Sequence, residues 1–368
     1  MKFTCTQENL NRGLLVVSHI AGRSATLPIL NNVLIKVDSG FIKLSTTNLE
    51  IGVSATVRGR VEKGGEFTVQ AKLLADYINL LPKENIELEL EDQTLYIRSD
   101  NYKTYIKGVD STDFPLIPDM AREESVTLKA KDFRKALAGV VFAAAMDESR
   151  PEISGIFFSF SGKTLTLVGT DSYRLAEAKI SLAQEVSEKK LIVPLRTLQE
   201  VYRILTESSE SEITLFVNEN QILFKLNDEV ELISRLVEGQ YPDYQQIIPG
   251  ESKTQAKVKV NEFIKVIKSA SLFCKPGIND VKISFLKDKN EIVVTAVNSA
   301  VGENLVNLEA ECSGQDNEVV FNYRYLLDGL NNLDKDEVQV EIISNSAPGV
   351  IRPVGDKNYL YIIMPIRQ

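Results

Sequence analysis

One pattern occurs three times along the chain, and this repetition limits the possible folds more than any single motif does. In each third, a helix-forming segment carries apolar residues at intervals of four, three and four positions. Residues at these intervals lie on one face of an α-helix, so each third offers an amphipathic helix to a core. These residues are Leu10, Leu14, Val17 and Ala21, then Phe133, Leu137, Val140 and Ala144, then Phe263, Ile267, Ala270 and Cys274.

A second strand-and-helix unit follows each of these helices. It begins at Phe67, Leu191 and Val319, and its helix carries an apolar stripe in the same register each time. The stripes consist of Leu74, Ile78 and Leu81, of Leu198, Tyr202 and Leu205, and of Leu326, Leu330 and Leu333. Each third is therefore expected to contain two helices. We predict them at 7–23 and 72–83, at 131–150 and 196–203, and at 261–275 and 322–333.

Short, β-branched or aromatic segments with alternating polarity fill the sequence between these helices. They are separated by turn-like residues, which is typical of antiparallel hairpins. The sequence therefore predicts an α+β fold of three similar domains, each with a sheet packed on its helix pair. Polar segments near residues 121 and 251 suggest the domains 1–121, 122–250 and 251–368. The expected strands are 32–37, 41–46, 86–91, 94–99, 156–160, 165–170, 213–217, 222–226, 292–297 and 359–364.

The three cysteines, Cys5, Cys274 and Cys312, are far apart and lack the CxxC spacing of a zinc site. An odd number of distant cysteines indicates neither a disulfide framework nor a metal centre, and it fits a reducing compartment. The N-terminus lacks the apolar segment of a signal peptide, and no apolar run approaches the length of a membrane span. We therefore expect a protein of the cytoplasm that does not enter a membrane.

Charge is distributed unevenly along the chain. The predicted helices carry a net charge of +6, so the rest carries −15 out of a total of −9. Basic helices that faced one way could meet an anionic rod such as a nucleic acid. The alternative is that these are ordinary solvated helix faces. The basic residues concerned are Arg12, Lys72, Arg134, Lys135, Arg196, Arg203, Lys265 and Lys268.

A search for catalytic residues finds few candidates. The single histidine, His19, falls within the apolar stripe of the first helix, so we expect it to be structural. The segment 162–164 reads Gly-Lys-Thr, but it lies between two strands and lacks the first glycine of a phosphate loop, so we interpret it as a hairpin turn. Asp171 and the pair 147–148 are interpreted as solvated loop carboxylates. We expect no enzyme activity, no cofactor and no metal.

Two segments call for a further explanation. The sequence GTDSYRLA at 169–176 ends a strand in a polar turn that carries a tyrosine and an arginine. The C-terminus, YLYIIMPIRQ at 359–368, stays apolar to within two residues of its end, whereas most termini are polar and frayed. This segment is either a final edge strand of the third sheet or part of a docking site, and both interpretations can hold together.

The threefold repeat and a series of motifs resemble the bacterial sliding clamp family, the beta subunits of DNA polymerase III. The motifs are TLPIL at 26–30, DESRPEISGI at 147–156, GTDSYRLA at 169–176, EGQYPDYQQIIP at 238–249 and YIIMPIRQ at 361–368. The resemblance implies a head-to-tail homodimer that forms a ring with pseudo-sixfold symmetry. Its helices would line a hole for duplex DNA, contacting phosphates without reading base sequence, and its sheets would form the outer wall.

The same resemblance implies a hydrophobic pocket near the C-terminus that binds short peptides from the catalytic subunit of DNA polymerase III, the clamp loader, and other polymerases and repair proteins. Two positions depart from the family pattern, Gln246, where arginine is common, and Gln368, where an apolar residue is common. The residues carried over to this pocket are Ile153, Thr170, Tyr173, Arg174, Leu175, Pro242, Gln246, Ile247, Ile362, Ile363, Met364, Pro365, Ile366 and Arg367.

For DNA, the family's basic positions facing the hole correspond to Arg23 or Ser24, Lys72, Arg150 and Arg196, with Lys103 a further candidate. At the dimer interface, Leu272 and Phe273 correspond to an apolar contact of the third domain, and Tyr105 is the counterpart in the first domain.

Two other classes of function remain open from the residues alone. The chain could be a noncatalytic repeat scaffold that binds peptides without DNA, which would form no closed ring. It could also be an enzyme that uses carboxylates alone, which would require a cluster of acidic side chains in a cleft.

Overall fold

A computed structural model describes residues 1–22, 27–147, 149–207 and 211–367. The chain divides into two compact units, one formed by residues 1–131 and 200–236 and the other by 132–199 and 237–368. No described helix has the length and apolar character needed to cross a membrane.

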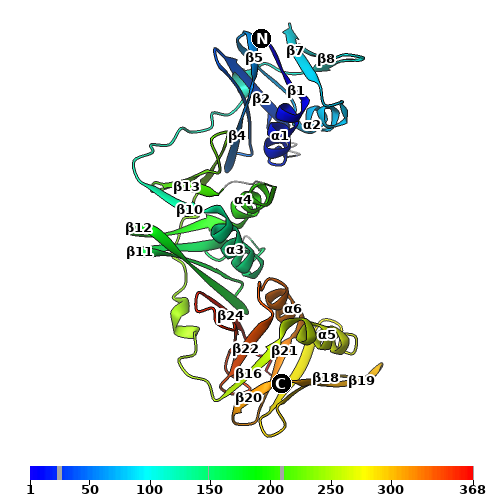
Figure 1. Ribbon diagram of the computed structural model, residues 1–368, viewed down its shortest axis with the longest axis vertical. Coiled ribbons are helices and arrows are strands. Elements are labelled where there is room, and N and C mark those ends of the chain that lie inside the picture. The colour runs from blue at the N-terminus through cyan, green and yellow to red at the C-terminus, as the bar shows by residue number, and fades with distance from the viewer. Residues whose placement is uncertain (23–26, 148, 208–210, 368) are drawn as a thin grey trace. The chain divides into compact units, whose positions relative to one another are not determined.

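Across the described ranges the chain forms six α-helices, two in each repeat as the apolar stripes predicted. Helices α1 and α2 lie side by side, and so do α5 and α6 (Figure 1). The stripe residues that lie within these helices are mostly buried, which confirms that each helix turns one face to the core. The helices are α1 (Gln7–Ser18), α2 (Ala71–Leu80), α3 (Ala130–Val140), α4 (Leu195–Glu207), α5 (Val260–Ser271) and α6 (Tyr323–Asn331).

Five helices end earlier than the sequence predicted, and in two of them, α1 and α3, other elements bind carbonyl groups near the helix end. The first helix was expected to reach residue 23, yet Thr46 Oγ1 and Arg203 Nη2 donate hydrogen bonds to the carbonyls of Val17 and Val16 at 2.6 and 3.1 Å. The third was expected to reach residue 150, yet the Tyr359 hydroxyl donates to the carbonyl of Gly139 at 3.0 Å. These side chains satisfy carbonyls that would otherwise lack a partner at a helix end.

The observed helix bounds reduce the charge contrast. Within their observed bounds the helices contain ten Lys or Arg and seven Asp or Glu, a net charge of +3, which leaves −12 on the rest of the chain. The predicted value of +6 was therefore too high. The sign of the contrast is unchanged.

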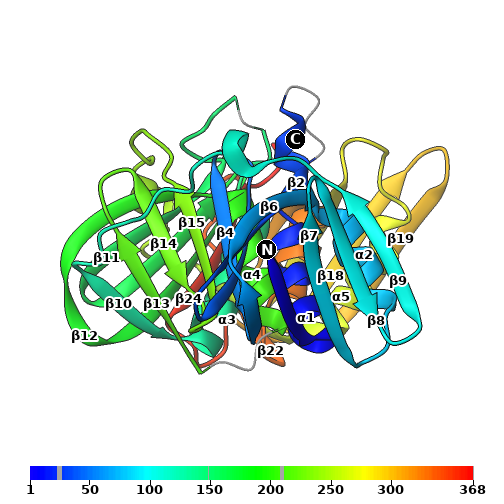
Figure 2. The same ribbon diagram turned by 90° about the horizontal axis from the view of Figure 1, so that it is seen from above.

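The first unit contains two antiparallel sheets. One has the order β5-β1-β7-β8-β9, and the other has the order β10-β13-β14-β15-β4-β3-β2-β6. The second sheet contains strands of two repeats. Strand β15 of the second repeat pairs with β4 of the first repeat, so the sheet continues from one repeat into the other (Figure 2). The strands are β1 (Lys2–Thr6), β2 (Asn32–Asp38), β3 (Phe41–Thr47), β4 (Ile51–Val57), β5 (Gly59–Lys63), β6 (Gly65–Gln70), β7 (Asn85–Glu91), β8 (Thr94–Ser99), β9 (Tyr102–Lys107), β10 (Ser125–Lys129), β13 (Glu212–Val217), β14 (Gln221–Lys225) and β15 (Val230–Arg235).

The second unit has the same plan. One sheet has the order β11-β12-β24-β23-β22-β16-β20 and the other the order β19-β18-β17-β21. Here β24 of the third repeat pairs with β12 of the second. The strands are β11 (Gly155–Thr170), β12 (Arg174–Pro194), β16 (Thr254–Lys259), β17 (Asp280–Leu286), β18 (Glu291–Asn298), β19 (Gly302–Glu309), β20 (Glu311–Gly314), β21 (Asn317–Asn322), β22 (Glu337–Ile342), β23 (Gly349–Pro353) and β24 (Tyr359–Ile363).

The segment 162–164 lies within β11, which includes both strands predicted on either side of it. Gly162 has a φ of 56°, and the pairing register between β11 and β12 shifts on both sides of this glycine. The predicted turn is thus an irregular point in one assigned strand. It does not open a helix, so it is not a phosphate loop.

The C-terminal strand is an interior strand. The sequence left open a final edge strand, but β24 lies between β12 and β23 and pairs with both. It ends at Ile363, so Pro365 follows the strand and removes no donor from the sheet.

Candidate functional site

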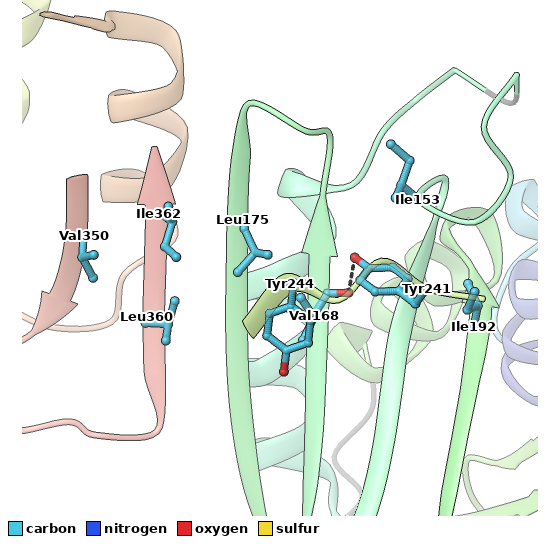
Figure 3. Close-up of a cluster of buried hydrophobic side chains, with 9 residues drawn as sticks. All are labelled: Ile153, Val168, Leu175, Ile192, Tyr241, Tyr244, Val350, Leu360 and Ile362. Carbon is cyan, nitrogen blue, oxygen red and sulfur yellow. Dashed lines mark hydrogen bonds between the residues drawn. The ribbon is translucent and has the colours of Figure 1, made fainter. Parts of the chain in front are cut away.

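A cluster of buried apolar side chains lies where β12, β23 and β24 meet (Figure 3). Leu175 extends from β12, Val350 from β23, and Leu360 and Ile362 from β24, so the second and third repeats both contribute. Ile247 and Ile248 of the segment between these repeats pack against the cluster and remain partly exposed. The buried members are Ile153, Val168, Leu175, Ile192, Tyr241, Tyr244, Val350, Leu360 and Ile362.

Strand β24 uses its two faces differently. Leu360 and Ile362 face the cluster, whereas Tyr359 and Tyr361 donate hydrogen bonds to the carbonyls of Gly139 and Tyr325, at 3.0 and 2.9 Å. Side chains alternate between the faces of a strand, so the fully buried Ile363 belongs with the two tyrosines. Ile362 thus faces the candidate site, and Ile363 lies on the opposite face of the strand.

The turn between β11 and β12 is held by its own side chains. Thr170 Oγ1 donates to the carbonyl of Arg174 at 2.6 Å and accepts from the backbone N–H of Ser172 at 3.1 Å. Asp171 accepts hydrogen bonds from the N–H groups of Tyr173 and Arg174. Asp171 is therefore a partly buried turn residue, and its interpretation as a solvated carboxylate was wrong. The turn leaves Tyr173 62% exposed.

Arg174 connects this turn to α6. Its guanidinium pairs with Asp171 at 2.9 Å and with Asp328 of α6, and it lies 4.7 Å from the ring centre of Tyr325. Tyr325 in turn stacks with Tyr173 at a centroid distance of 6.5 Å. Tyr325 and Asp328 were missed from the sequence, because no local pattern links them to Arg174.

The segment after β24 is fixed by backbone hydrogen bonds on two sides. The N–H of Met364 donates to the carbonyl of Tyr173, and the N–H of Ile366 donates to the carbonyl of Val320, both at 2.8 Å. Met364 and Pro365 remain partly exposed, and Arg367 is exposed. Residues 364–366 are therefore held between the turn that carries Tyr173 and strand β21.

The segment between the second and third repeats covers the cluster with two tyrosines. The Tyr241 hydroxyl donates to the carbonyl of Val168, and the Tyr244 hydroxyl donates to Glu177 at 2.6 Å. Burial, and then the bond to Glu177, raise the pKa of Tyr244, so its hydroxyl stays protonated and donates. Pro242 and Gln246, by contrast, are exposed.

Of the residues predicted to contact DNA, Lys72, Arg150 and Arg196 have exposed side chains, whereas Arg23 and Ser24 lie outside the described residues. Arg150 Nη1 donates to the hydroxyl of Ser172 at 2.9 Å, which places Arg150 beside the turn that carries Tyr173. Gln368 also lies outside the described residues, and so does Glu148 of the predicted acidic pair.

Two of the helix cations are engaged with carboxylates of their own unit. Lys135 lies 3.6 Å from Asp334, and Arg203 Nε donates to the buried Glu200 at 3.0 Å. His19 Nδ1 lies 2.7 Å from the same Glu200. His19 caps α1 and its side chain is 65% exposed, so its predicted place in the apolar stripe was wrong.

The residues predicted at a dimer interface are exposed in both repeats concerned. Tyr105 on β9 is 61% exposed and Leu272 after α5 is 75% exposed, while Phe273 is partly buried. Further exposed apolar residues accompany them and were missed. Those on α2 are apolar helix positions outside the buried stripe, which was a usable signal. The additional residues are Leu73, Leu80 and Tyr102 in the first repeat, and Val301 and Leu305 in the third.

No cluster of three or more His, Cys, Asp or Glu side chains suited to a metal ion occurs within the described part of the chain.

Three family models match successive parts of the chain. They describe the N-terminal domain of the DNA polymerase III beta subunit at residues 1–118, its central domain at 127–243 and its C-terminal domain at 245–367. The chain belongs to the DNA polymerase III beta subunit family. The resemblance seen in the motifs is thereby confirmed, as is the fold of three clamp domains with helices and antiparallel sheets. The chain has the sliding-clamp function of this family.

Individual relatives agree over the full length. The beta sliding clamp of Synechococcus elongatus is 30% identical over 376 residues, which cover 100% of this chain and 99% of the relative. The beta sliding clamp of Staphylococcus aureus is 30% identical over 352 residues, 93% of each chain.

Solved structures of beta subunits have the same fold. The DNA polymerase III beta subunit of Thermotoga maritima superposes with a TM-score of 0.94 at 27% identity, covering 100% of this chain and 99% of that one. The DNA polymerase sliding clamp of Bacillus subtilis gives a TM-score of 0.95 at 26% identity, with the same coverage.

Proposed function

We propose that two copies of this chain join head to tail into a closed ring around duplex DNA, slide along it without sequence preference, and tether polymerases and other partners through the C-terminal site. The observation that carries this proposal is that a sheet runs from one repeat into the next at two places, β15–β4 and β24–β12. The same step repeated between two chains would close the ring.

The strands that could pair between two chains in this way are β9 and β19. Each is the last strand at one end of its sheet, so its outer backbone groups face away from the sheet. In the order of each repeat, β9 corresponds to β15 and β24, whereas β19 corresponds to β4 and β12. An open strand edge of this kind is a template for pairing with another chain, and head-to-tail pairing buries it.

Backbone bonds fix this correspondence residue by residue. After the last strand of each repeat, one backbone N–H donates to a carbonyl that lies three residues before the start of the second helix of that repeat. The bonds are Val109 to Thr68, Val237 to Ile192 and Ile366 to Val320. The residues four positions earlier, Tyr105, Ile233 and Ile362, are therefore equivalent. Ile233 pairs with Gly52 and Ile362 with Leu175. Gly52 and Leu175 are each the first residue after a turn to pair with the strand before that turn.

The equivalent residue on β19 is Gly302, the first to pair with β18 after its turn. The same register places Tyr105 of one chain opposite Gly302 of the other. The Phe273 ring lies beside Gly302, 3.8 Å from where a Cβ would be.

For DNA, exposed cations would contact phosphates. The residues proposed from the family are Lys72 and Arg196 on helices and Arg150 in the loop before β11, with Arg23 or Ser24 outside the described residues. Phosphate contacts carry no sequence information, which is what a sliding ring requires. Retention would come from enclosure, so the modest net charge of +3 on the helices is sufficient.

For partners, the C-terminal site would hold the apolar side chains of a short peptide against Leu175, Ile247, Ile362, Met364 and Pro365. Exposed Tyr173 and partly exposed Met364 offer adaptable apolar contacts, and Arg174 braces the turn beneath them. The partners proposed are the polymerase III catalytic subunit, the clamp loader, and other polymerases and repair proteins. The chain would act without catalysis.

Two further predictions stand with this proposal. The domain limits remain 1–121, 122–250 and 251–368. The proposed compartment remains the cytoplasm, where thiols stay reduced, and the three cysteines are free thiols. Burial raises the pKa of Cys5 to about 12, which keeps this thiol protonated.

A pair of cysteines tests the ring. In the proposed register Thr104 lies opposite Glu303, so a chain carrying Thr104→Cys and Glu303→Cys is expected to form two disulfides per dimer under mild oxidation, since paired Cα atoms lie about 5 Å apart. The expected product in a denaturing gel is a closed dimer without a ladder of longer species. Thr104→Cys with Glu309→Cys is the control, because its cysteines would lie roughly 20 Å apart.

A monomer as the only product would contradict the ring. DNA then distinguishes a clamp from a peptide-binding scaffold. The ring, placed by its loader on nicked circular DNA, is expected to stay bound until the circle is cut. Equal retention on linear and circular DNA would favour the scaffold.

A further inference from the structure

We propose that Arg324 contacts the DNA backbone, as the third member of a set of equivalent basic side chains whose other members are Lys72 and Arg196. This inference rests on the proposed ring around DNA. It adds a DNA contact on α6 of the third repeat, a helix for which neither the family pattern nor its net charge of zero had indicated one.

The three residues hold the same position in their repeats. Each is the second residue of the second helix, because α2 begins at Ala71, α4 at Leu195 and α6 at Tyr323. Two residues further on, each helix has a fully buried leucine that fixes its rotation against the core. These leucines are Leu74, Leu198 and Leu326.

A shared helix rotation gives the three basic side chains the same direction relative to their own domain. All three are exposed. If Lys72 and Arg196 face the DNA in the first and second domains, Arg324 therefore faces it in the third.

Helix stability does not explain these cations. The positive end of the helix dipole favours acidic residues in the first turn and disfavours basic ones. The first helix of each repeat follows this preference with Glu8, Asp132 and Glu262. The first turns of α2, α4 and α6 contain no acidic residue and a basic residue instead. A local preference broken in the same way three times points to a shared function.

The Arg324 guanidinium is available for such a contact. Within the described part of the chain it forms no ion pair; its partner is the neighbouring Tyr323, whose side chain hydrogen-bonds to it and whose ring centre lies 6.0 Å away. The acidic residue on the same helix, Asp328, is paired with Arg174. Summed along the sequence, α6 has a net charge of zero because Arg324 and Asp328 cancel, but in the structure Asp328 faces a different cation.

An arginine suits a phosphate contact because its guanidinium is always charged and presents several N–H donors. Two other helix cations, Lys135 and Arg203, are less available because they are already paired with carboxylates. The class of ligand is therefore the phosphodiester backbone, met from the third domain of each chain.

The test compares Arg324→Ser with Arg196→Ser and with Lys163→Ser, a control that removes an exposed lysine on strand β11. A fluorescent duplex is titrated into the purified dimer at several salt concentrations. Removing one cation from a phosphate lowers the slope of log affinity against log salt by about 0.9, so a dimer changed in both chains should show a slope smaller by roughly 1.8. We expect Arg324→Ser and Arg196→Ser to show this decrease and Lys163→Ser to match the original chain.

Two results would overturn the inference. In the first, Arg324→Ser binds DNA with the original slope while Arg196→Ser has a smaller slope, which would leave the proposed clamp intact. In the second, Arg324→Ser keeps the DNA slope but weakens a partner peptide, which would assign Arg324 to the C-terminal site. Light scattering checks that each variant is still a dimer. A chain that forms no dimer and binds no duplex would contradict the proposed function itself.

Discussion

The junction between the first and second repeats and that between the second and third repeats share one backbone plan but differ in their side chains. At each junction the last strand of one repeat pairs with a strand of the preceding repeat, β15 with β4 and β24 with β12. The same kind of turn comes directly before β4 and before β12. At the first junction, Thr47 Oγ1 donates to the carbonyl of Ile51 and accepts from the N–H of Leu49, and Asn48 accepts two backbone bonds. These are the bonds that Thr170 and Asp171 make at the second junction.

The equivalent sheet faces are covered differently. At the first junction Gly52 occupies the position of Leu175, and a Cβ there would lie 2.8 Å from Cγ2 of Ile117. Ile117 of the segment between the repeats packs on the cluster of Met120, Phe216, Leu223 and Ile233. At the second junction the chain continues past β24 into the partly exposed Met364 and Pro365. A linker therefore covers part of each junction, and at the second junction the partly exposed Met364 and Pro365 are the residues proposed to contact a partner.

A carboxylate on the second helix reaches the preceding repeat at both junctions. Glu200 is paired with Arg203 and His19, and its side chain is 4% exposed. Asp328 occupies the same helix position, is paired with Arg174, and is 47% exposed. The first junction therefore buries its ion pair more fully, and the second keeps its ion pair at the edge of the candidate binding site.

The largest expected effect is on Glu200. Glu200→Ala should lower the free energy of unfolding by about 3 kcal/mol, because it leaves Arg203 without its buried partner. Asp328→Ala should cost about 1 kcal/mol, since its pair is half exposed. Asp76, exposed at the same position of α2, is the control, and Asp76→Ala should change stability by less than about 0.5 kcal/mol. Urea denaturation measures all three, and equal losses would contradict the difference in burial.

Making the first junction resemble the second should also destabilise it. Gly52→Leu is expected to cost about 2 kcal/mol, because the new side chain meets Ile117 and Ile233. Adding Ile117→Ala should recover part of that loss by making space beside residue 52. If the double variant is no more stable than Gly52→Leu alone, Ile117 does not fill this position.

The exposed end of the second junction should matter for binding and little for stability. Met364→Ala combined with Pro365→Ala is expected to weaken a clamp-binding peptide at least tenfold, about 1.4 kcal/mol, without affecting dimer formation. Arg235→Ala, at the position equivalent to Met364 in the first junction, should leave peptide affinity unchanged. Calorimetric titration measures both, and an unchanged affinity in the first variant would refute the assignment of the site.

The smallest effect is expected from His19. His19→Phe introduces the residue type found at the equivalent position, Phe142, and removes one partner of Glu200. Because the imidazole is largely exposed, the cost should be about 0.5 kcal/mol by urea denaturation, well below that of Glu200→Ala. A loss as large as that of Glu200→Ala would mean that His19, and not Arg203, is the main partner.

The sequence predicted the elements well because their apolar periodicity is local. Helix existence, the threefold repeat and most strands follow from intervals of three, four and two residues. Helix ends were less well predicted, because they depend on Thr46, Arg203 and Tyr359, which are distant in sequence from the carbonyls they bind. The interior position of β24 depends on pairing with β12, nearly 200 residues earlier, for which the pattern of one strand contains no signal.

The candidate site shows the same division. Its apolar members could be named from motifs, but the bracing of Arg174 by Asp328 and Tyr325 could not, because nothing local links these residues. Arg324 could have been found by aligning the three repeats at their second helices. It was hidden because net charge per helix ignores which charges are already paired.

Electron microscopy of the purified protein at micromolar concentration tests the central claim most directly. A ring of two chains would give particles with a six-lobed outline and a central hole wide enough for duplex DNA. Compact or elongated particles without a hole, persisting at high concentration, would contradict the ring and with it the proposed pairing of β9 with β19.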